Sequence, residues 1–298
     1  MLAARWKDLL QKPGSLPALP EVLIRLQFGL YQLDVDIDDL CDCLQLDPAL
    51  TVEILKTVNS PLFGIPRRIA SLRHAVVLLG LRRMRAIILS QSLRQSLAMY
   101  PSPAFKLTQW WDCSVLSATA AGWLCQRVWP DMVEEAFLSG LIAEVGILVL
   151  ARHEPRYEAI LRRHVGRPAR ELHAATREEL DVCPIELTAE FLDMWKFPST
   201  VVNAVRHHQD PAVFTEAEPS FLSQAVYVAC LLTEYVVSND PQRLEQLAIL
   251  AAMHMYVGRQ ETGPFIQTCL ERYRVAAEPL GFGRLGENLA SEGLANTA

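Results

Sequence analysis

The sequence has no uninterrupted apolar run of the roughly 18 residues that a membrane-spanning helix needs, so no membrane span is expected. Its first residues lack both a long apolar core and a small-residue cleavage site, so no signal peptide is expected. Basic residues are in deficit as well: 28 Lys and Arg stand against 34 Asp and Glu, and the net charge is −6. This balance argues against general affinity for nucleic acid, which needs a basic surface. The sequence therefore predicts a cytoplasmic protein.

The cysteines lack the pattern of a disulfide framework. They are odd in number and scattered along the chain, as reduced cytosolic thiols are. The seven are Cys41, Cys43, Cys113, Cys125, Cys183, Cys230 and Cys269. What the chain has in abundance is hydrophobic residues, at 51% of 298 positions, which is enough for one large domain or two smaller ones.

The hydrophobic pattern is helical throughout and predicts an all-α fold. Asp47 followed by Pro48 predicts a helix start, and Asn59 is expected to end that helix in a left-handed conformation. Ser71 is expected to cap a short helix that stops at Gly80. The other helices expected are 23–33, 36–45, 81–97, 107–127, 132–153, 154–165, 171–180, 185–195, 200–208, 220–237, 242–255 and 263–277.

The clearest break in the chain is at Pro101 and Pro103, which disfavour helix on both sides of Ser102. We therefore expect a helical subdomain over residues 1–100 and a second over 104–280. Residues 281–298 have little periodicity and are expected to form a flexible tail.

The stretch from Leu141 to Leu150 resembles the segment that carries the adjacent His-Asp metal ligands of HD-domain phosphohydrolases. Ala143 and Glu144 stand at the two ligand positions, and Ile147 stands where that family has lysine. An alanine methyl group has no lone pair for a metal. The resemblance thus implies a scaffold without its catalytic centre.

Four further motifs resemble one branch of that superfamily, the HDOD domain (HD-related output domain) of bacterial signalling proteins. They are Leu16-Pro17-Ala18-Leu19-Pro20, Asp47-Pro48-Ala49-Leu50, Asn59-Ser60 with Phe63-Gly64, and Ala75-Val76 with Leu78-Leu79-Gly80-Leu81. The resemblance extends from Leu16 to Ala277 and implies a multi-helical HD-like fold of two packed subdomains. Many relatives carry this domain fused to receiver or cyclic-di-GMP-turnover domains, so a signalling partner acting in trans is expected here.

The remaining ligand positions of the catalytic family can be compared one by one. Only its His-His pair is retained, and adjacent residues of a regular helix point about 100° apart, so both cannot address one metal. The degenerate positions are Cys113, Ala143, Glu144, Cys183, Pro184, His207, His208 and Cys230. We therefore expect no catalytic residue, no bound metal and no cofactor, with Cys113, Ala143 and Cys230 filling the vacated centre as packed core.

A zinc site remains an alternative interpretation, because Cys113, Cys183, Cys230 and a histidine are ligands that zinc favours. These cysteines lack the close Cys-x-x-Cys spacing of structural zinc sites. The other histidines are expected at surface or cap positions: His74, His153, His164, His173 and His254.

A basic cluster is the candidate partner-binding surface. Arg82, Arg83 and Arg85 are expected on one face of the helix over 81–97. Cations in a first helical turn oppose the helix dipole, so carboxylates of the chain itself, an acidic partner, a nucleotide or nucleic acid could offset them.

Together these observations predict a non-catalytic output module that acts through protein–protein interaction in a bacterial regulatory pathway, with a link to cyclic-di-GMP signalling as one option. The alternatives are a residual metal-dependent phosphohydrolase and a binder of nucleotide or nucleic acid through the arginines. The ligand count weighs against the first alternative and the acidic charge against the second.

Overall fold

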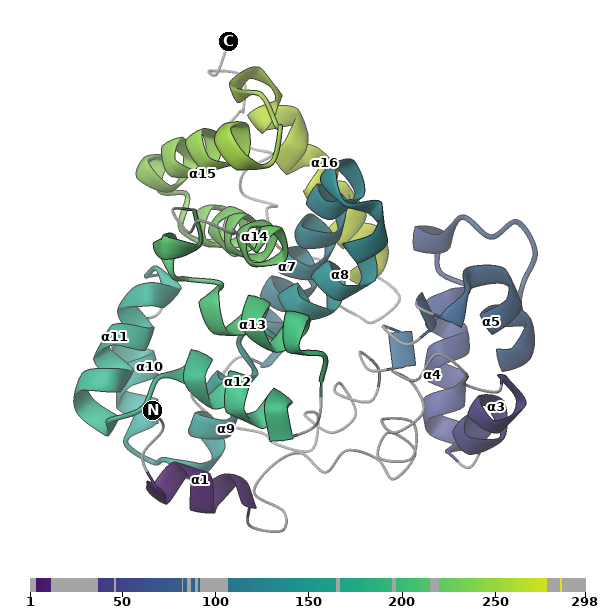
Figure 1. Ribbon diagram of the computed structural model, residues 1–298, viewed down its shortest axis with the longest axis horizontal. Helices are drawn as coiled ribbons and strands as arrows, with labels where there is room; N and C mark the ends of the chain where they lie inside the picture. The colour runs from purple at the N-terminus through teal and green to yellow at the C-terminus, as the bar shows by residue number, and fades with distance from the viewer. Residues whose placement is uncertain are drawn as a thin grey trace.

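The computed structural model describes residues 4–11, 37–45, 47–81, 83–84, 87–88, 91, 107–164, 167–194, 197–214, 220–277 and 285. These residues form helices joined by turns, and no strand occurs among them (Figure 1), which confirms the all-α prediction. The α-helices are α1 Ala4–Gln11, α3 Ile37–Gln45, α4 Pro48–Val58, α5 Leu72–Leu79, α7 Leu107–Val128, α8 Val133–Ile142, α9 Val145–His153, α10 Tyr157–Arg163, α11 Ala169–Leu180, α12 Pro184–Met194, α13 Ser199–His207, α14 Phe221–Ser238, α15 Pro241–His254 and α16 Thr262–Ala277. Short 3-10 turns are η1 Pro61–Phe63, η2 Pro130–Met132, η3 Pro211–Phe214 and η4 Arg259–Glu261.

The predicted start of α4 is confirmed: Oδ1 of Asp47 accepts a hydrogen bond from the backbone N–H of Leu50 at 2.9 Å, and Pro48 is the first helical residue. The helix ends at Asn59 as predicted, but Asn59 does not have the left-handed conformation that was expected. Asn59 has φ −81°, outside the left-handed region. Its side-chain amide instead donates to the carbonyl of Ile69 at 2.8 Å, and Oδ1 accepts from the N–H of Ile69 at 2.7 Å.

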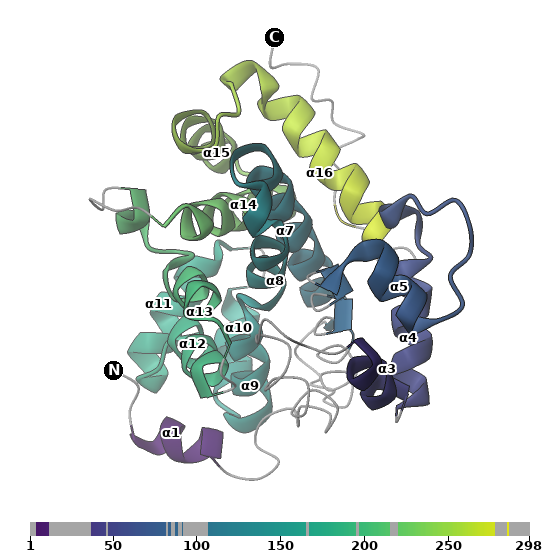
Figure 2. The same cartoon turned by 45° about the vertical axis from the view of Figure 1, so that its right-hand side comes forward.

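Helix α5 follows its prediction more closely. The Ser71 hydroxyl accepts a hydrogen bond from the N–H of His74 at 3.1 Å, and Gly80 ends the helix with φ +81°. Figure 2 shows α3, α4 and α5 packed together, with the end of α16 against this group. The predicted helix over 23–33 and the subdomain boundary near Pro101 lie outside the described residues, so the division into subdomains stays a prediction.

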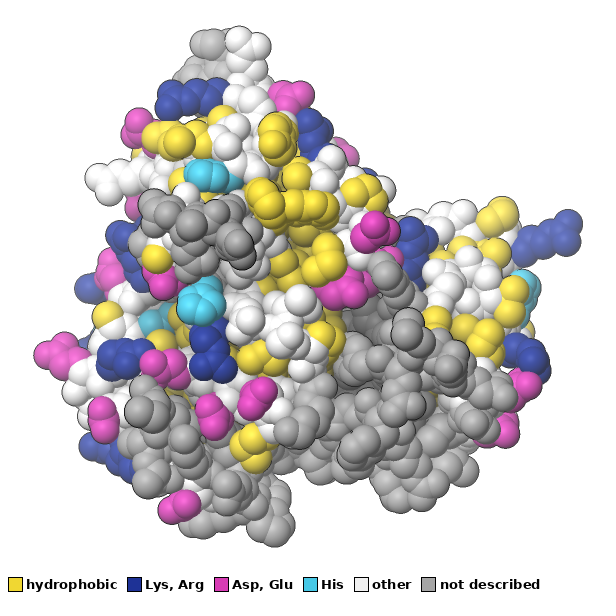
Figure 3. All heavy atoms as spheres, in the orientation of Figure 1, with side chains coloured by type: hydrophobic (Ala, Val, Ile, Leu, Met, Phe, Trp, Pro, Cys, Tyr) yellow, Lys and Arg dark blue, Asp and Glu magenta, His cyan; other side chains and the backbone are white. Residues whose placement is uncertain are grey.

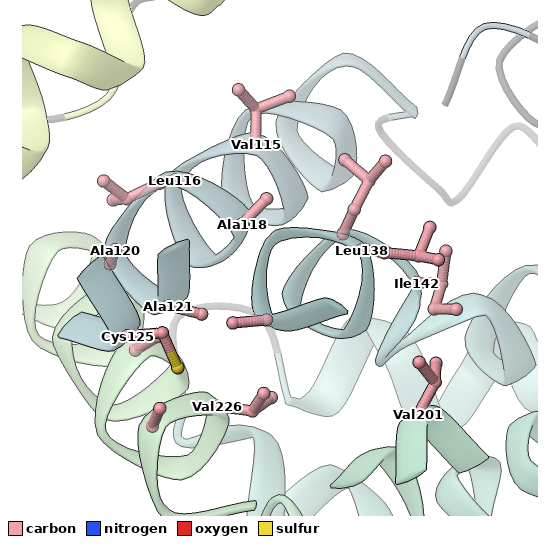
Figure 4. Packing of buried hydrophobic residues seen from close by; sticks show 14 of the residues in the cluster. Val115, Leu116, Ala118, Ala120, Ala121, Cys125, Leu138, Ile142, Val201 and Val226 are labelled. Atoms are coloured by element: carbon pink, nitrogen blue, oxygen red, sulfur yellow. The ribbon is translucent and has the colours of Figure 1, made fainter. Parts of the chain in front are cut away.

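Helix α7 is the centre of the main core. Its small residues Ala118 and Ala121 let it lie close to α8 and α14, and Leu138, Ile142 and Val226 pack around them (Figure 4). Helix α14 is long and apolar enough to span a membrane by composition, but 72% of that stretch is buried inside the protein. Its apolar character is that of a core helix.

The first helix packs on the later part of the chain. Trp6 of α1 is only 4% exposed and belongs to a second hydrophobic cluster with Leu150 of α9, Tyr157 and Leu161 of α10. Residues 4–11, expected within the N-terminal subdomain, therefore contribute to the packing of the C-terminal helices.

The predicted continuous helix over 132–153 is wrong, because a turn at Ala143 and Glu144 divides it into α8 and α9. Each half packs on a different neighbour. A Cβ atom at Gly140 of α8 would lie 2.7 Å from the carbonyl oxygen of Ser117 in α7. A Cβ atom at Gly146 of α9 would lie 2.0 Å from the carbonyl oxygen of Pro184 in α12. The two halves of the predicted helix thus pack closely on different neighbours, α7 and α12, and the chain turns between them.

We predict that Gly146→Ala lowers the free energy of unfolding by more than about 3 kcal/mol, because the backbones of α9 and α12 would have to separate. The close packing of α9 on α12 also lets the N–H of Gly146 donate a hydrogen bond to Oγ1 of Thr188 at 2.8 Å, and the substitution would weaken that bond. Urea denaturation measures the change.

The matched control is Gly122→Ala in α7, where the nearest atoms to an added Cβ lie at ordinary contact distance, 3.6 Å. Alanine is the better helix former by about 1 kcal/mol, so this variant should be neutral or more stable. Equal effects of the two substitutions would contradict the close approach of α9 to α12.

Candidate functional site

Glu144 is the centre of the candidate site. It lies in the turn between α8 and α9, and this turn directs its side chain inward, where it is 20% exposed. The indole N–H of Trp110 in α7 donates to the Glu144 backbone carbonyl at 3.3 Å and holds the turn in place. The helix break that the sequence did not predict is therefore what positions the carboxylate.

Two imidazoles and an amide surround this carboxylate. Nε2 of His173, from α11, lies 2.9 Å from Oε2 of Glu144, and Nε2 of His208, at the end of α13, lies 3.1 Å from Oε1. The Gln209 side-chain amide donates to Oε1 at 3.2 Å. His208 has no exposed surface and His173 is 5% exposed. We call Glu144, His173, His208 and Gln209 the carboxylate–imidazole cluster.

The hydrogen-bond partners fix the tautomers of both rings. Nδ1 of His208 lies 2.6 Å from the Val205 carbonyl, which can only accept, so Nδ1 carries a proton. Nδ1 of His173 lies 3.0 Å from Oε1 of Gln209, whose amide nitrogen faces Glu144, so this Nδ1 also donates. A hydrogen bond between each Nε2 and the carboxylate then requires a further proton in each contact. For His173 this geometry is that of an imidazolium ring on a carboxylate.

The electrostatics of Glu144 and His173 agree with this arrangement. Burial alone would raise the pKa of Glu144, but the imidazoles of His173 and His208 outweigh it and hold that pKa well below its usual value. Burial alone would lower the pKa of His173, but the Glu144 carboxylate and the hydrogen bonds to Glu144 and Gln209 raise it above 6.5. Each group thus stabilises the charged form of the other.

The His-His pair behaves as the helix geometry predicts. His208 enters the carboxylate–imidazole cluster, whereas the His207 side chain is 40% exposed and lies 3.8 Å from Asp210. The prediction that both cannot face one site is confirmed.

The surface or cap role expected for His173 is wrong, and Gln209 was not identified from the sequence. The spacing contained a usable signal for the histidine: His173, Thr176 and Leu180 recur at helical intervals and form the buried face of α11. Nothing in that periodicity identifies Glu144 as the partner, because α11 and the turn at Glu144 are brought together only by the tertiary fold.

A cavity of about 290 Å³ lies beside Glu144. Cys113, Ala143 and Cys230 all line it, so the expectation that these three positions form packed core is wrong. Ala143 is 1% exposed, while Cys113 and Cys230 are half-buried. The small side chains at these three positions leave space, because no larger neighbour collapses into it.

The cavity has a second carboxylate. Glu234 of α14 lines it, accepts a hydrogen bond from the N–H of Ala169 at 3.1 Å, and lies 3.5 Å from Nε of Arg243. Burial raises the pKa of Glu234, and the Arg243 guanidinium opposes that rise. At the cavity edge Arg167 is exposed and lies 3.6 Å from Glu171. The described lining is therefore not a site for strongly anionic groups.

The residues of the zinc alternative do not converge. Cys113 and Cys230 line the cavity, but Cys183 and Pro184 lie at the start of α12 and do not. Burial, followed by Asp112 and Glu144, raises the pKa of the Cys113 thiol to about 12, and burial with Glu144 and Glu234 raises that of Cys230. Burial therefore disfavours the thiolate form of both cysteines, which is the form that binds zinc.

The carboxylate–imidazole cluster also does not fit the metal of catalytic HD domains. Each Glu144 oxygen faces a different imidazole, so the carboxylate bridges the rings, and the three side chains do not converge on one point. Within the described ranges, no group of three or more His, Cys, Asp or Glu side chains is arranged to hold a metal ion.

Of the candidate partner-binding arginines, the structure describes only Arg83; Arg82 and Arg85 lie outside the described residues. The Arg83 side chain is 56% exposed, and its Nε lies 3.4 Å from Oε1 of Glu134 in α8. Met84 and Ile88 of the same segment are buried, so Arg83 lies on the exposed side as predicted.

Comparison with known proteins agrees with this fold. The sequence profile of the HDOD domain matches residues 16–211. An uncharacterized protein of Treponema pallidum is 26% identical over 268 residues, which are 88% of this chain and 51% of that protein. The chain thus spans about half the length of this curated relative.

Solved structures share the architecture at low sequence identity. A protein of Shewanella amazonensis, provisionally named a phosphohydrolase, superposes with a TM-score of 0.73 at 19% identity, over 93% of this chain and 98% of that one. An HDOD domain protein of unknown function from Geobacter sulfurreducens gives 0.69 at 18%, over 92% and 96%. A protein of Marinobacter aquaeolei, provisionally named a signal transduction protein, gives 0.72 at 20%, over 94% and 62%. At these identities the likeness shows the fold alone.

We predict that His173 stabilises the fold most between about pH 4.5 and about pH 6.5. Its raised pKa makes its contribution complete below 6.5 and lost as pH rises through the folded-state value. The lowered pKa of Glu144 makes its contribution complete above 4.5 and lost as pH falls. In urea denaturation, His173→Gln should cost about 1.5–3 kcal/mol near pH 5.5 and clearly less near pH 9.

His207→Gln is the control, because it removes an imidazole from the neighbouring position but not from the cluster. It should change stability little at any pH in this range. A loss for His173→Gln that is constant from about pH 5 to about pH 9 would contradict the imidazolium–carboxylate pairing.

Proposed function

Since this chain belongs to the HDOD domain family, we propose that it is a non-catalytic output module that works by binding a partner protein in a bacterial signalling pathway. The observation that carries the proposal is the state of Glu144. Both oxygens of this carboxylate accept hydrogen bonds from side chains of the protein. A group satisfied in this way is a structural element and has little capacity left to ligate a metal.

The adjacent positions support the same proposal. Ala143 carries no donor atom, and the ring of Pro184 offers neither a side-chain ligand nor an N–H. Hydrolysis of a phosphoester in this superfamily needs a metal with an open position for water. A residual phosphohydrolase would have to assemble such a site from other residues, and no observation on the described chain favours that.

The surface charge favours a protein partner over nucleic acid. In Figure 3 the Lys and Arg side chains of the visible face are interspersed with Asp and Glu, and the whole chain has a net charge of −6. An exposed arginine on an acidic protein can guide an acidic protein surface without binding nucleic acid in general. We expect the partner among signalling proteins, those of cyclic-di-GMP turnover included.

We predict that the purified protein holds no stoichiometric transition metal and does not hydrolyse nucleotides or cyclic dinucleotides. Elemental analysis after expression in metal-supplemented medium tests the first part, and product chromatography tests the second. One Fe, Mn or Zn per chain, removed by a chelator together with a hydrolytic activity, would show that the site is catalytic.

We also predict that Arg82→Glu, Arg83→Glu and Arg85→Glu together abolish recovery of the partner while the protein stays folded. Charge reversal turns an attraction for an acidic surface into repulsion. Affinity purification from the native cell with mass spectrometry identifies the partner, and binding of the isolated pair is then measured for each variant.

The control is His207→Ala, which alters the exposed member of the His-His pair and leaves both the arginines and the buried cluster intact. This variant should keep partner binding if its circular dichroism is native. If the arginine variant binds as well as the unchanged protein and the histidine variant does not, the docking surface lies at the former metal site.

A further inference from the structure

A second cavity lies away from the carboxylate–imidazole cluster and shares none of its described lining residues with the Glu144 cavity. Its volume is about 180 Å³. It forms where residues of α4, η1 and the segment at 83–91 face helices α7, α8 and α16. Figure 2 shows α16 reaching the α4 and α5 side of the molecule there.

The walls of this cavity are apolar and largely aromatic. They include Phe63, Ile87, Trp111, Val115, Trp123 and Phe137. An apolar cavity of about 150 Å³ is large enough to bind a benzene-sized molecule. The cavity therefore has room for one aromatic ring or a short aliphatic chain.

The edge of the cavity is charged. Arg83 and Arg272 are both exposed and both line it, against a single described acidic residue, Glu134. Arg83 meets Glu134 through one long contact of 3.4 Å between Nε and Oε1. Nη1 of Arg272 donates a hydrogen bond to Oε1 of Gln126, a neutral side chain, at 3.3 Å. The described lining thus carries one positive charge in excess.

We propose that this cavity binds a small amphipathic carboxylate. Its apolar body would lie among the tryptophan and phenylalanine side chains, and its carboxylate would accept hydrogen bonds from the guanidinium groups of Arg83 and Arg272. Guanidinium groups suit this role because they pair with carboxylates through two parallel hydrogen bonds. The ligand would join Phe63 and Arg83, near the N-terminal helices, to Trp123 and Arg272 of the C-terminal helices.

This proposal does not depend on the proposed function: it does not involve the Glu144 site, and although Arg83 also belongs to the candidate partner-binding surface, the test below relies on Arg272, which does not. Isothermal titration of the full chain tests it with two probe acids, phenylacetate and octanoate. The comparison ligands are the alcohol and the amine with the same carbon skeletons. We expect each acid to bind at least about 10-fold more tightly than its alcohol, and the amine to bind most weakly.

Two variants locate the site. Arg272→Gln should remove most of the preference for acid over alcohol, whereas Arg274→Gln, two residues along α16 and not in the lining, should retain it. Ala276→Phe places a ring in the cavity and should weaken binding of acid and alcohol alike. If the melting curve shows that Ala276→Phe does not fold, the result for Arg272→Gln alone tests where the ligand binds.

Several outcomes would overturn the proposal. One is that neither acid binds to the full chain. Another is that alcohol or amine binds as tightly as acid. A third is that a folded Ala276→Phe variant, or Arg272→Gln, binds the acids as the unchanged protein does.

Discussion

A carboxylate that points into the protein has to be compensated where it lies, and the structure around Glu144 follows from how this is done. Its two oxygens take hydrogen bonds from His173 and His208, which belong to different helices. The carboxylate thereby joins the turn between α8 and α9 to α11 and to the end of α13. Removing Glu144 would leave Nε2 of both imidazoles without this partner, and removing His173 would leave Oε2 of Glu144 without its described partner, which costs more than the loss of an exposed pair.

This cluster joins the helices by hydrogen bonds, which is a different chemistry from metal ligation. A metal binds neutral imidazoles through a lone pair and leaves a position open for water. Here each ring nitrogen next to Glu144 needs a proton, because the other nitrogen already donates to a carbonyl or amide oxygen. In this arrangement the Nε2 atoms of both imidazoles face the oxygens of Glu144.

Much of the fold could be predicted from the sequence, because helical periodicity and caps are local. Asp47 and Ser71 cap their helices as predicted, and the four motifs of residues 16–81 indicated the right family. The turn at Ala143 could not be predicted in this way. It depends on contacts of Gly140 with α7 and of Gly146 with α12, and a local pattern contains neither neighbour. His173 was missed for the same reason, since its partner is 29 residues away.

The charge of the cavity beside Glu144 limits the anions that it can bind. A phosphoester brings negative charge, and in a catalytic relative the metal would offset it. In this chain two carboxylates, Glu144 and Glu234, line the cavity instead, and the guanidinium at its described edge, Arg167, is paired with Glu171. A histidine introduced at position 113 or 143 would leave both carboxylates, and therefore the negative charge of the cavity, unchanged. The two carboxylates and the paired Arg167 of the described lining therefore disfavour the binding of a phosphoester in this cavity.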